Sequence, residues 1–248
     1  MKVCIAGTGA ITAPNRYLVE KSDFTLESFY YFKEWQIPII KGSKLFLLDS
    51  GAFTFMNSCK EQVDFDEYLE RYIAFINKYD VTYFFELDID SVVGYEKVKE
   101  LRRKLERGTG KKCIPVWHKS RGLDEWKKLC QEYDYVAIGG IVTREITKKE
   151  YKFFKPLLKF ARENSCKVHG LGFTNLKELS SYDFYSVDST SWKSGNRFGS
   201  LYQFKDNELL LIKKPAGKKV KSGEYYGLVE KHNYLEWIKF QKYADAYL

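Results

Sequence analysis

Acidic residues, histidines and glycines recur directly after short apolar runs of this sequence. Asp49 follows LFLL, and Asp188 follows FYSV and precedes Ser189, Thr190 and Ser191. Two carboxylates, one acting as nucleophile and one carrying protons, are what retaining cleavage of a glycosidic bond needs. The other residues at such positions are Asp88 and Asp90 near YFFEL, His118 after IPVW, Gly139 and Gly140 after YVAI, and His169, Gly170 and Gly172 in KVHGLG.

Each of these residues also has a purely structural interpretation. Asp49-Ser50-Gly51 is typical of a turn or helix N-cap, and Gly139-Gly140 of a tight turn. Asp88 and Asp90 resemble a metal pair, but alternate residues of a strand face opposite ways, so one should point elsewhere. The placement of all these residues after successive apolar runs favours a functional site.

Eight apolar runs are predicted to be strands, with helical patterns between them. Apolar strands joined by helical crossovers indicate a parallel sheet, and eight strands favour a (β/α)8 barrel, whose active sites lie at the carboxyl ends of the strands. The predicted strands are 3–6, 45–48, 82–86, 113–117, 135–138, 167–169, 184–187 and 209–212. The runs 201–204 and 209–212 flank a polar turn and are also compatible with a hairpin. We expect a single domain over residues 1–248.

Three helical segments have clear sequence signals. Apolar residues recur at helical spacing over 64–78, and 229–243 reads as a closing helix. Thr147 and Glu150 form a capping box that opens another helix, which Pro156 should kink or shorten.

The composition indicates a folded chain with an anionic partner. The 248 residues are 44% apolar and 17% aromatic, and the formal net charge is +8 with a pI of about 9.0. The five cysteines occur singly, without metal-type spacing, which favours reduced thiols. The N-terminal apolar run is too short for a signal peptide or a membrane span, so we expect a cytoplasmic protein without membrane contact.

Four motifs in this order resemble the tRNA-guanine transglycosylase superfamily. They are LLDSGAFTF (47–55), YVAIGGIVTRE (135–145), KVHGLGFTNLKEL (167–179) and FYSVDSTSW (184–192). The style is most similar to the compact phage-type branch that inserts 7-deazaguanines into DNA, and the resemblance spans about residues 45–197. The family fold is a (β/α)8 barrel, in agreement with the strand pattern.

The resemblance implies a role for each matching residue. Asp188 would attack the anomeric carbon of the sugar, and Asp49 would handle the protons of the leaving and incoming bases. Phe53 would stack on the base, and Asp88 would read the purine edge. The remaining base-binding residues implied are Gly139, Gly140, His169 and Gly170, with His118 at a position where the tRNA enzymes often have glutamine.

The departures from the family pattern favour the DNA branch. Ala52 and Thr54 stand where the tRNA enzymes have glycine and glutamine, which leaves the identity of the 7-deazaguanine open. No cysteine follows Cys166, so the structural zinc of the tRNA enzymes has no ligand supply. We therefore expect no metal and no other cofactor.

Aromatic and basic residues after Asp188 are candidates for nucleic-acid contacts. Phe53 and Trp192 would stack on bases, although core packing is the alternative for Trp192. Lys193 and Arg197 would hold phosphates. The segment 213–223 would form a basic phosphate-binding loop, with a solvated surface loop as the alternative; its predicted contacts are Lys213, Lys214, Lys218 and Lys219.

These observations predict a pentosyltransferase that exchanges guanine in DNA for a free 7-deazaguanine base such as preQ0. It would act in the cytoplasm, that of the host if the protein is phage-encoded. The same chemistry on tRNA is the first alternative. A non-catalytic nucleic-acid-binding barrel and a barrel hydrolase of small anionic substrates are the others.

Overall fold

The computed structural model describes residues 1–51, 63–173, 176–195, 200–213 and 225–248. Within these ranges eight parallel strands form one curled sheet in the order β4-β3-β2-β1-β8-β7-β6-β5. Its strands are β1 (Lys2–Ala6), β2 (Phe24–Ser28), β3 (Leu45–Asp49), β4 (Tyr83–Phe84), β5 (Val116–Trp117), β6 (Tyr135–Ile138), β7 (Lys167–Gly170) and β8 (Ser186–Ser189). The predicted α/β class with a parallel sheet is confirmed, and seven of the eight predicted strands belong to this sheet.

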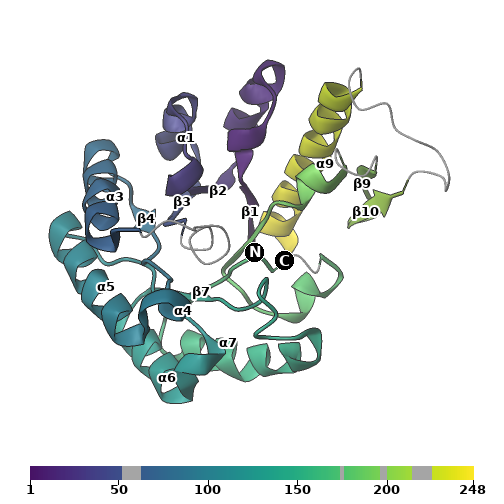
Figure 1. The fold of residues 1–248 in the computed structure, drawn as a ribbon. Helices are drawn as coiled ribbons and strands as arrows, with labels where there is room; N and C mark the ends of the chain where they lie inside the picture. The colour runs from purple at the N-terminus through teal and green to yellow at the C-terminus, as the bar shows by residue number, and fades with distance from the viewer. Residues whose placement is uncertain (52–62, 174–175, 196–199, 214–224) are drawn as a thin grey trace.

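Helices surround the curled sheet, as Figure 1 shows. The α-helices are α1 (Ile37–Gly42), α3 (Phe65–Tyr79), α4 (Asp90–Val93), α5 (Tyr95–Thr109), α6 (Gly122–Glu132), α7 (Phe154–Glu163) and α9 (Tyr226–Tyr247). The 3₁₀ helices are η1 (Thr8–Ala10), η2 (Ala13–Lys21), η3 (Phe29–Tyr31), η4 (Glu34–Gln36), η5 (Lys119–Arg121), η6 (Lys148–Phe153), η7 (Leu176–Ser181) and η8 (Ser191–Lys193). No helix in the described ranges is long and apolar enough to cross a membrane.

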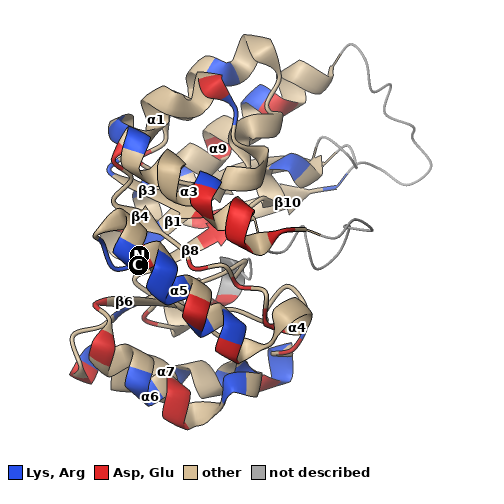
Figure 2. Cartoon of the chain, turned by 60° about the vertical axis from the view of Figure 1, so that its left-hand side comes forward, with Lys and Arg blue, Asp and Glu red and all other residues tan. Residues whose placement is uncertain are grey.

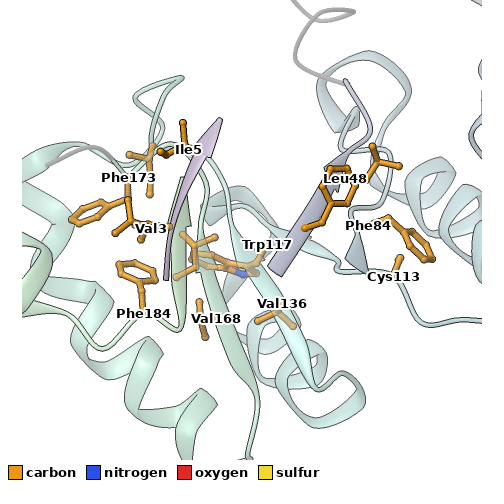
Figure 3. Close-up of a cluster of buried hydrophobic side chains, with 14 of the residues drawn as sticks. Val3, Ile5, Leu48, Phe84, Cys113, Trp117, Val136, Val168, Phe173 and Phe184 are labelled. Carbon is orange, nitrogen blue, oxygen red and sulfur yellow. The ribbon is translucent and has the colours of Figure 1, made fainter. Parts of the chain in front are cut away.

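Alternation along the strands separates an inner from an outer apolar layer. The outer cluster joins strand residues such as Val3 and Leu48 to helix residues such as Trp126, and part of it is drawn in Figure 3. The inner cluster contains no helix residue, and its buried members are Cys4, Ala6, Phe24, Leu26, Leu45, Leu47, Phe85, Ile114, Val116, Tyr135 and Ala137. Because strand side chains alternate between faces, these residues mark the concave interior of the sheet.

Between β4 and β5 a buried carboxylate takes over part of the strand pairing. Phe85 and Ile114 form one isolated parallel bridge, and the next backbone N–H, that of Val116, donates to Glu86 Oε1 at 2.9 Å. Arg121 and Arg102 hold the two oxygens of Glu86 at 2.8 and 2.9 Å. Burial nevertheless raises the pKa of Glu86. Because the Glu86 side chain takes the place of a backbone acceptor here, the predicted strands 82–86 and 113–117 are each reduced to two residues.

The second strand of the sheet was not predicted. Phe24 and Leu26 face the interior, but the alternating Thr25 and Glu27 are also buried, against the expectation for polar residues. Thr8 satisfies Glu27 through its backbone N–H at 2.8 Å and its hydroxyl at 2.5 Å. A polar residue with such partners is stable inside, but the partners are invisible in the local sequence.

The predicted strand 209–212 does not belong to the curled sheet. It is β10 (Glu208–Ile212), which pairs antiparallel with β9 (Leu201–Lys205) in a separate two-stranded sheet. The prediction of an eighth barrel strand at 209–212 was therefore wrong, and the hairpin alternative is confirmed. Aromatic contacts hold the hairpin against α9, with Tyr202 and Trp237 ring centroids 5.5 Å apart.

The predicted helix signals are confirmed by local hydrogen bonds. The Asp64 carboxylate caps α3 by accepting the N–H groups of Asp66 and Glu67. Thr147 and Glu150 form the predicted capping box. The helix it opens is 3₁₀ up to Phe153 and becomes α-helical at Phe154, which places Pro156 in the first turn of α7, where no backbone donor is needed.

The last helix is tied to the first strands. The Gln241 amide donates to the backbone oxygens of Val3 and Phe24, both at 2.8 Å, and the N-terminal ammonium of Met1 donates to Ala244 O at 2.9 Å. The two chain ends consequently lie near each other (Figure 1).

Candidate active site

Asp188 lies on the inner face of β8. It pairs in register with Cys4, a member of the inner cluster, and is 8% exposed. Its Oδ1 accepts the backbone N–H of Gly172 at 2.6 Å and lies 3.2 Å from His169 Nε2. These contacts fix the carboxylate at the carboxyl end of the sheet.

Asp49 is the last residue of β3 and also continues the inner series, two residues after Leu47. Its Oδ2 accepts the backbone N–H of Gly51 at 2.9 Å. Burial raises the pKa of Asp49 to about 6, and the charges of Asp188 and Asp88 contribute to the rise. Asp49 is therefore suited to exchange protons near neutral pH.

His118 lies between two carboxylates. Its Nε2 is 2.7 Å from Asp88 Oδ1 and its Nδ1 is 2.9 Å from Glu145 Oε2, and Glu145 also accepts the N–H of Ser120 at 2.7 Å. Burial opposes protonation of His118, but Asp88 and Glu145 outweigh it and raise its pKa to about 9. The ring therefore carries a positive charge at neutral pH.

The charge of His118 predicts a pH-dependent stability. Because its pKa rises from 6.5 to about 9 on folding, its contribution is present below pH 6.5 and is lost as the pH rises through 9. We expect the free energy of unfolding to fall between pH 6.5 and 9.5 by more in the wild type than in His118→Gln, measured by urea denaturation. Equal falls in the two proteins would contradict the charged state.

Asp88 and Asp90 lie beyond the end of β4 at Phe84, so the strand alternation expected for them does not apply, although their main partners differ. Asp88 contacts His118, whereas Asp90 opens α4 and receives Arg121 at 2.5 and 2.7 Å. Arg121 Nη2 also lies 3.5 Å from Asp88 Oδ1. Asp90 is thus part of the buried ion-pair network around Glu86, and Asp88 is the carboxylate of the pair that contacts His118.

Glycines at the strand ends allow close approaches. A Cβ on Gly139 would lie 2.7 Å from Cε1 of His118, and one on Gly172, at φ +67°, would lie 2.3 Å from Val142 Cγ2. The Gly139 N–H donates to Trp117 O at 2.9 Å, so that N–H is not available for the predicted base platform. Gly140 O accepts the N–H of Ile146 at 3.0 Å.

His169 and Gly170 end β7 beside Asp188. His169 is fully buried, and its contacts are Asp188 at Nε2 and Ser186 Oγ at Nδ1, 2.5 Å away. His169 therefore lies behind the Asp188 carboxylate. From this position it does not reach a base directly, which differs from the role that the resemblance implies. Gly170 pairs with Val187 of β8.

The predicted nucleic-acid contacts differ in their outcomes. Trp192 is fully buried, its Nε1–H donates to Ala6 O at 2.9 Å, and its ring packs edge-on against Tyr234 with centroids 5.0 Å apart. The predicted base stacking by Trp192 is thus wrong in this structure, and its core-packing alternative holds. Lys193 lies over the Trp192 ring at 5.3 Å. Burial raises the pKa of Glu27, and the charge of Lys193 offsets part of that rise.

Truncation of Trp192 should reveal its structural role. We expect Trp192→Ala to lower the free energy of unfolding by about 3–5 kcal/mol, because it removes a fully buried ring and leaves a cavity. Tyr247→Ala, at the 75% exposed end of α9, is the control and should change it by less than about 0.5 kcal/mol. Urea denaturation measures both, and a Trp192→Ala protein as stable as the control would contradict the core assignment.

The remaining predicted contacts are mostly outside the described residues. Lys213 is exposed directly after β10. Basic and acidic residues are interspersed along α5 and α6 (Figure 2), so these two helices lack the single-sign surface typical of phosphate binding. The predicted contacts that fall outside the described ranges are Phe53, Arg197, Lys214, Lys218 and Lys219.

Three polar residues of the site were not singled out from the sequence. Glu145 lies within the motif YVAIGGIVTRE, at a position where only its contact with His118 identifies it. Ser186 lies two residues before Asp188, and Tyr135 lies two residues before Ala137, so all four face the interior. This period-2 spacing was the sequence signal that could have identified Ser186 and Tyr135. Within the described ranges, no three His, Cys, Asp or Glu side chains cluster as metal ligands.

Comparison with known proteins adds no family assignment. No protein-family model matches the chain, and a search of curated proteins finds no matching relative. The geometry of the inner carboxylates and the four motifs are therefore the basis for the function considered next.

Proposed function

We propose that the chain is a guanine transglycosylase that exchanges guanine in DNA for a 7-deazaguanine base through a covalent bond between Asp188 and the sugar. The observation that carries the proposal is the placement of Asp188 and Asp49 on the inner face at the carboxyl ends of β8 and β3. The charge of Asp188 contributes to the raised pKa of Asp49, as expected for two carboxylates that share one site. Barrel enzymes bind their substrates at this end of the strands.

In the first displacement, ionised Asp188 attacks C1′ of the nucleotide. The C1′–N9 bond breaks, its electron pair goes to guanine, and an Asp188–C1′ ester forms. Guanine leaves poorly as an anion, so protonated Asp49 donates a proton to it. A pKa of about 6 leaves part of Asp49 protonated near neutral pH, which supports this role.

In the second displacement, the incoming 7-deazaguanine replaces guanine. Asp49, now ionised, accepts the proton from the ring nitrogen that attacks C1′, and the ester to Asp188 breaks. Two inversions at C1′ retain the configuration of the glycosidic bond. The exchange is balanced by the two residues alone, and the proposal includes no cofactor.

The cluster around His118 supports recognition of the base edge. Asp88 lies beside His118, and its side chain is 17% exposed. We assign Asp88 to the purine edge. His118, 2.7 Å from Asp88 Oδ1, fixes the orientation of Asp88, and Glu145, 2.9 Å from the other ring nitrogen, holds His118 in place. The target nucleotide would leave the duplex stack or be met in single-stranded form.

The choice of DNA over tRNA rests on the sequence. No cysteine follows Cys166, so the zinc site of the tRNA enzymes lacks ligands. The lysines in 213–223 would then contact phosphates, within one catalytic unit that spans residues 1–248 and acts in the cytoplasm.

Incubation with radiolabelled guanine tests the proposal. Duplex DNA, single-stranded DNA and tRNA are offered in parallel, and label is counted in the precipitated polymer. We expect label in DNA and none in tRNA. Label in tRNA alone would overturn the DNA assignment, and no label in any polymer would favour the non-catalytic barrel.

A further inference from the structure

A chain of hydrogen-bonded side chains runs through the sheet interior to Asp188. Tyr135 Oη lies 2.5 Å from Ser186 Oγ, Ser186 Oγ lies 2.5 Å from His169 Nδ1, and His169 Nε2 lies 3.2 Å from Asp188 Oδ1. The four residues come from three neighbouring strands, β6, β7 and β8. Tyr135 and Ser186 lie within two of the four motifs, but the proposed exchange gives neither of them a role.

If the His169 imidazole is neutral, every hydrogen bond in this series has a defined donor and acceptor. An ionised Asp188 only accepts hydrogen bonds, so His169 Nε2 must carry the proton toward it. Nδ1 is then an acceptor, and the Ser186 hydroxyl must donate to it. The Tyr135 hydroxyl in turn donates to Ser186, and burial raises the pKa of Tyr135, which keeps that phenol protonated.

Burial of Ser186 excludes the interpretation of these hydrogen-bonded side chains as the triad of a serine hydrolase. Ser186, His169 and Asp188 have the order of a serine-hydrolase triad, but Ser186 is fully buried and its hydroxyl is shared with Tyr135. A substrate carbonyl cannot reach that oxygen without opening the sheet. Asp188 ends the series and, at 8%, is the most exposed of its four residues, so we take the other three to act on Asp188.

We propose that His169 is a positioning residue, locked by Ser186 and Tyr135 as the neutral Nε2–H tautomer. His169 and the Gly172 N–H together hold Asp188 Oδ1, which leaves Oδ2 as the atom that bonds to C1′. This inference rests on the proposed transglycosylase function. A neutral donor orients the carboxylate without offering it the proton that an imidazolium would supply, so the nucleophile keeps its negative charge.

The same contacts remain useful after the bond to the sugar forms. Oδ1 then becomes the carbonyl oxygen of the Asp188 ester and still accepts from Gly172 and His169. When the second base attacks C1′, Oδ2 leaves as carboxylate, and the same two donors stabilise the charge that returns. The chain thus serves both displacements without itself transferring a proton.

Nitrogen-15 NMR of the histidine rings tests the lock without any nucleic acid. We expect His169, assigned by the signal lost in His169→Gln, to show a protonated Nε2 and a bare Nδ1 at pH 7.5. Ser186→Ala and Tyr135→Phe should each shift the Nδ1 resonance. A doubly protonated ring, or a proton on Nδ1, would overturn the proposed tautomer.

The rate of covalent adduct formation with DNA tests the positioning role. His169→Leu should slow it about a hundredfold, since small misplacements of a reacting group cost that much, while His169→Gln, which can donate and accept at the same places, should restore most of the rate. Ser22→Ala is the matched control, because Ser22 and Tyr234 form a buried hydroxyl pair at 2.8 Å away from the site. Adduct formation at the wild-type rate in His169→Leu would overturn the positioning role, whereas no adduct in the wild type would overturn the proposed function itself.

Discussion

Asp188→Asn is expected to abolish guanine exchange, lowering its rate by about 10⁴-fold or more. The amide has the shape of the carboxylate and can still accept the Gly172 N–H, so the fold should survive. It lacks the charge that stabilises an oxocarbenium-like transition state and the oxygen nucleophile that forms the ester. The measurement is incorporation of radiolabelled guanine into DNA, with the covalent adduct followed on a denaturing gel.

Asp183→Asn is the matched control for this change. Asp183 also lies close to β8, but its side chain is exposed and forms a surface ion pair with Arg162 at 2.7 Å. Surface pairs of this kind contribute about 0–1 kcal/mol, so both exchange and stability should stay near the wild-type values. Exchange that persists in Asp188→Asn would remove Asp188 as the nucleophile.

The fold was predictable where the apolar pattern alone determines the structure. Runs such as 45–48 and 135–138 alternate between two buried faces and became strands at or near the predicted positions. Strand β2 was missed because Glu27 is stabilised inside by Thr8, a residue nineteen positions away. The pattern at 209–212 predicts a strand correctly but contains no information on its partner, so the hairpin with β9 was only one of two interpretations.

The residues of the candidate site that lie at the ends of strands were predictable from the sequence. Asp49 and Asp188 follow apolar strands, and a parallel sheet brings such positions to one end. Glu145 and Ser186 depend on contacts between distant segments, and their types do not distinguish them from surface glutamates or ordinary buried serines. Trp192 illustrates the opposite error, because its place after Asp188 suggested a base contact, whereas the fold inserts its ring between β1 and α9.

Asp49→Asn is expected to stabilise the protein at pH 7.5 while it impairs exchange. The pKa of Asp49 is raised from 3.8 to about 6 in the folded state, so the folded protein holds a proton there that the unfolded chain has already released. Stability therefore falls as the pH rises from about 4 to about 6, and above that the buried charge costs about 3 kcal/mol. Asparagine removes the charge and can still accept the Gly51 N–H.

Urea denaturation at two pH values separates this effect from a general one. Asp49→Asn should be more stable than the wild type at pH 7.5 and about equally stable at pH 3.5, where Asp49 is mostly protonated in both the folded and the unfolded state. Asp183→Asn, whose carboxylate is exposed, should show no such gain. Equal stability of Asp49→Asn and wild type at pH 7.5 would mean that Asp49 is not held at a raised pKa.

The pH dependence of the exchange rate is an independent measure of the pKa of Asp49. Asp49 must be protonated when guanine leaves and ionised when the new base enters, so exchange should be fastest near pH 6 and fall on both sides. Asp49→Asn should lower the rate by about 10²–10⁴-fold and lose the optimum, because the amide neither donates nor accepts that proton. Since one residue serves both half-reactions, a wild-type rate that stays constant from pH 4.5 to 7.5 would assign the proton transfers to another group, whatever the stability of Asp49→Asn.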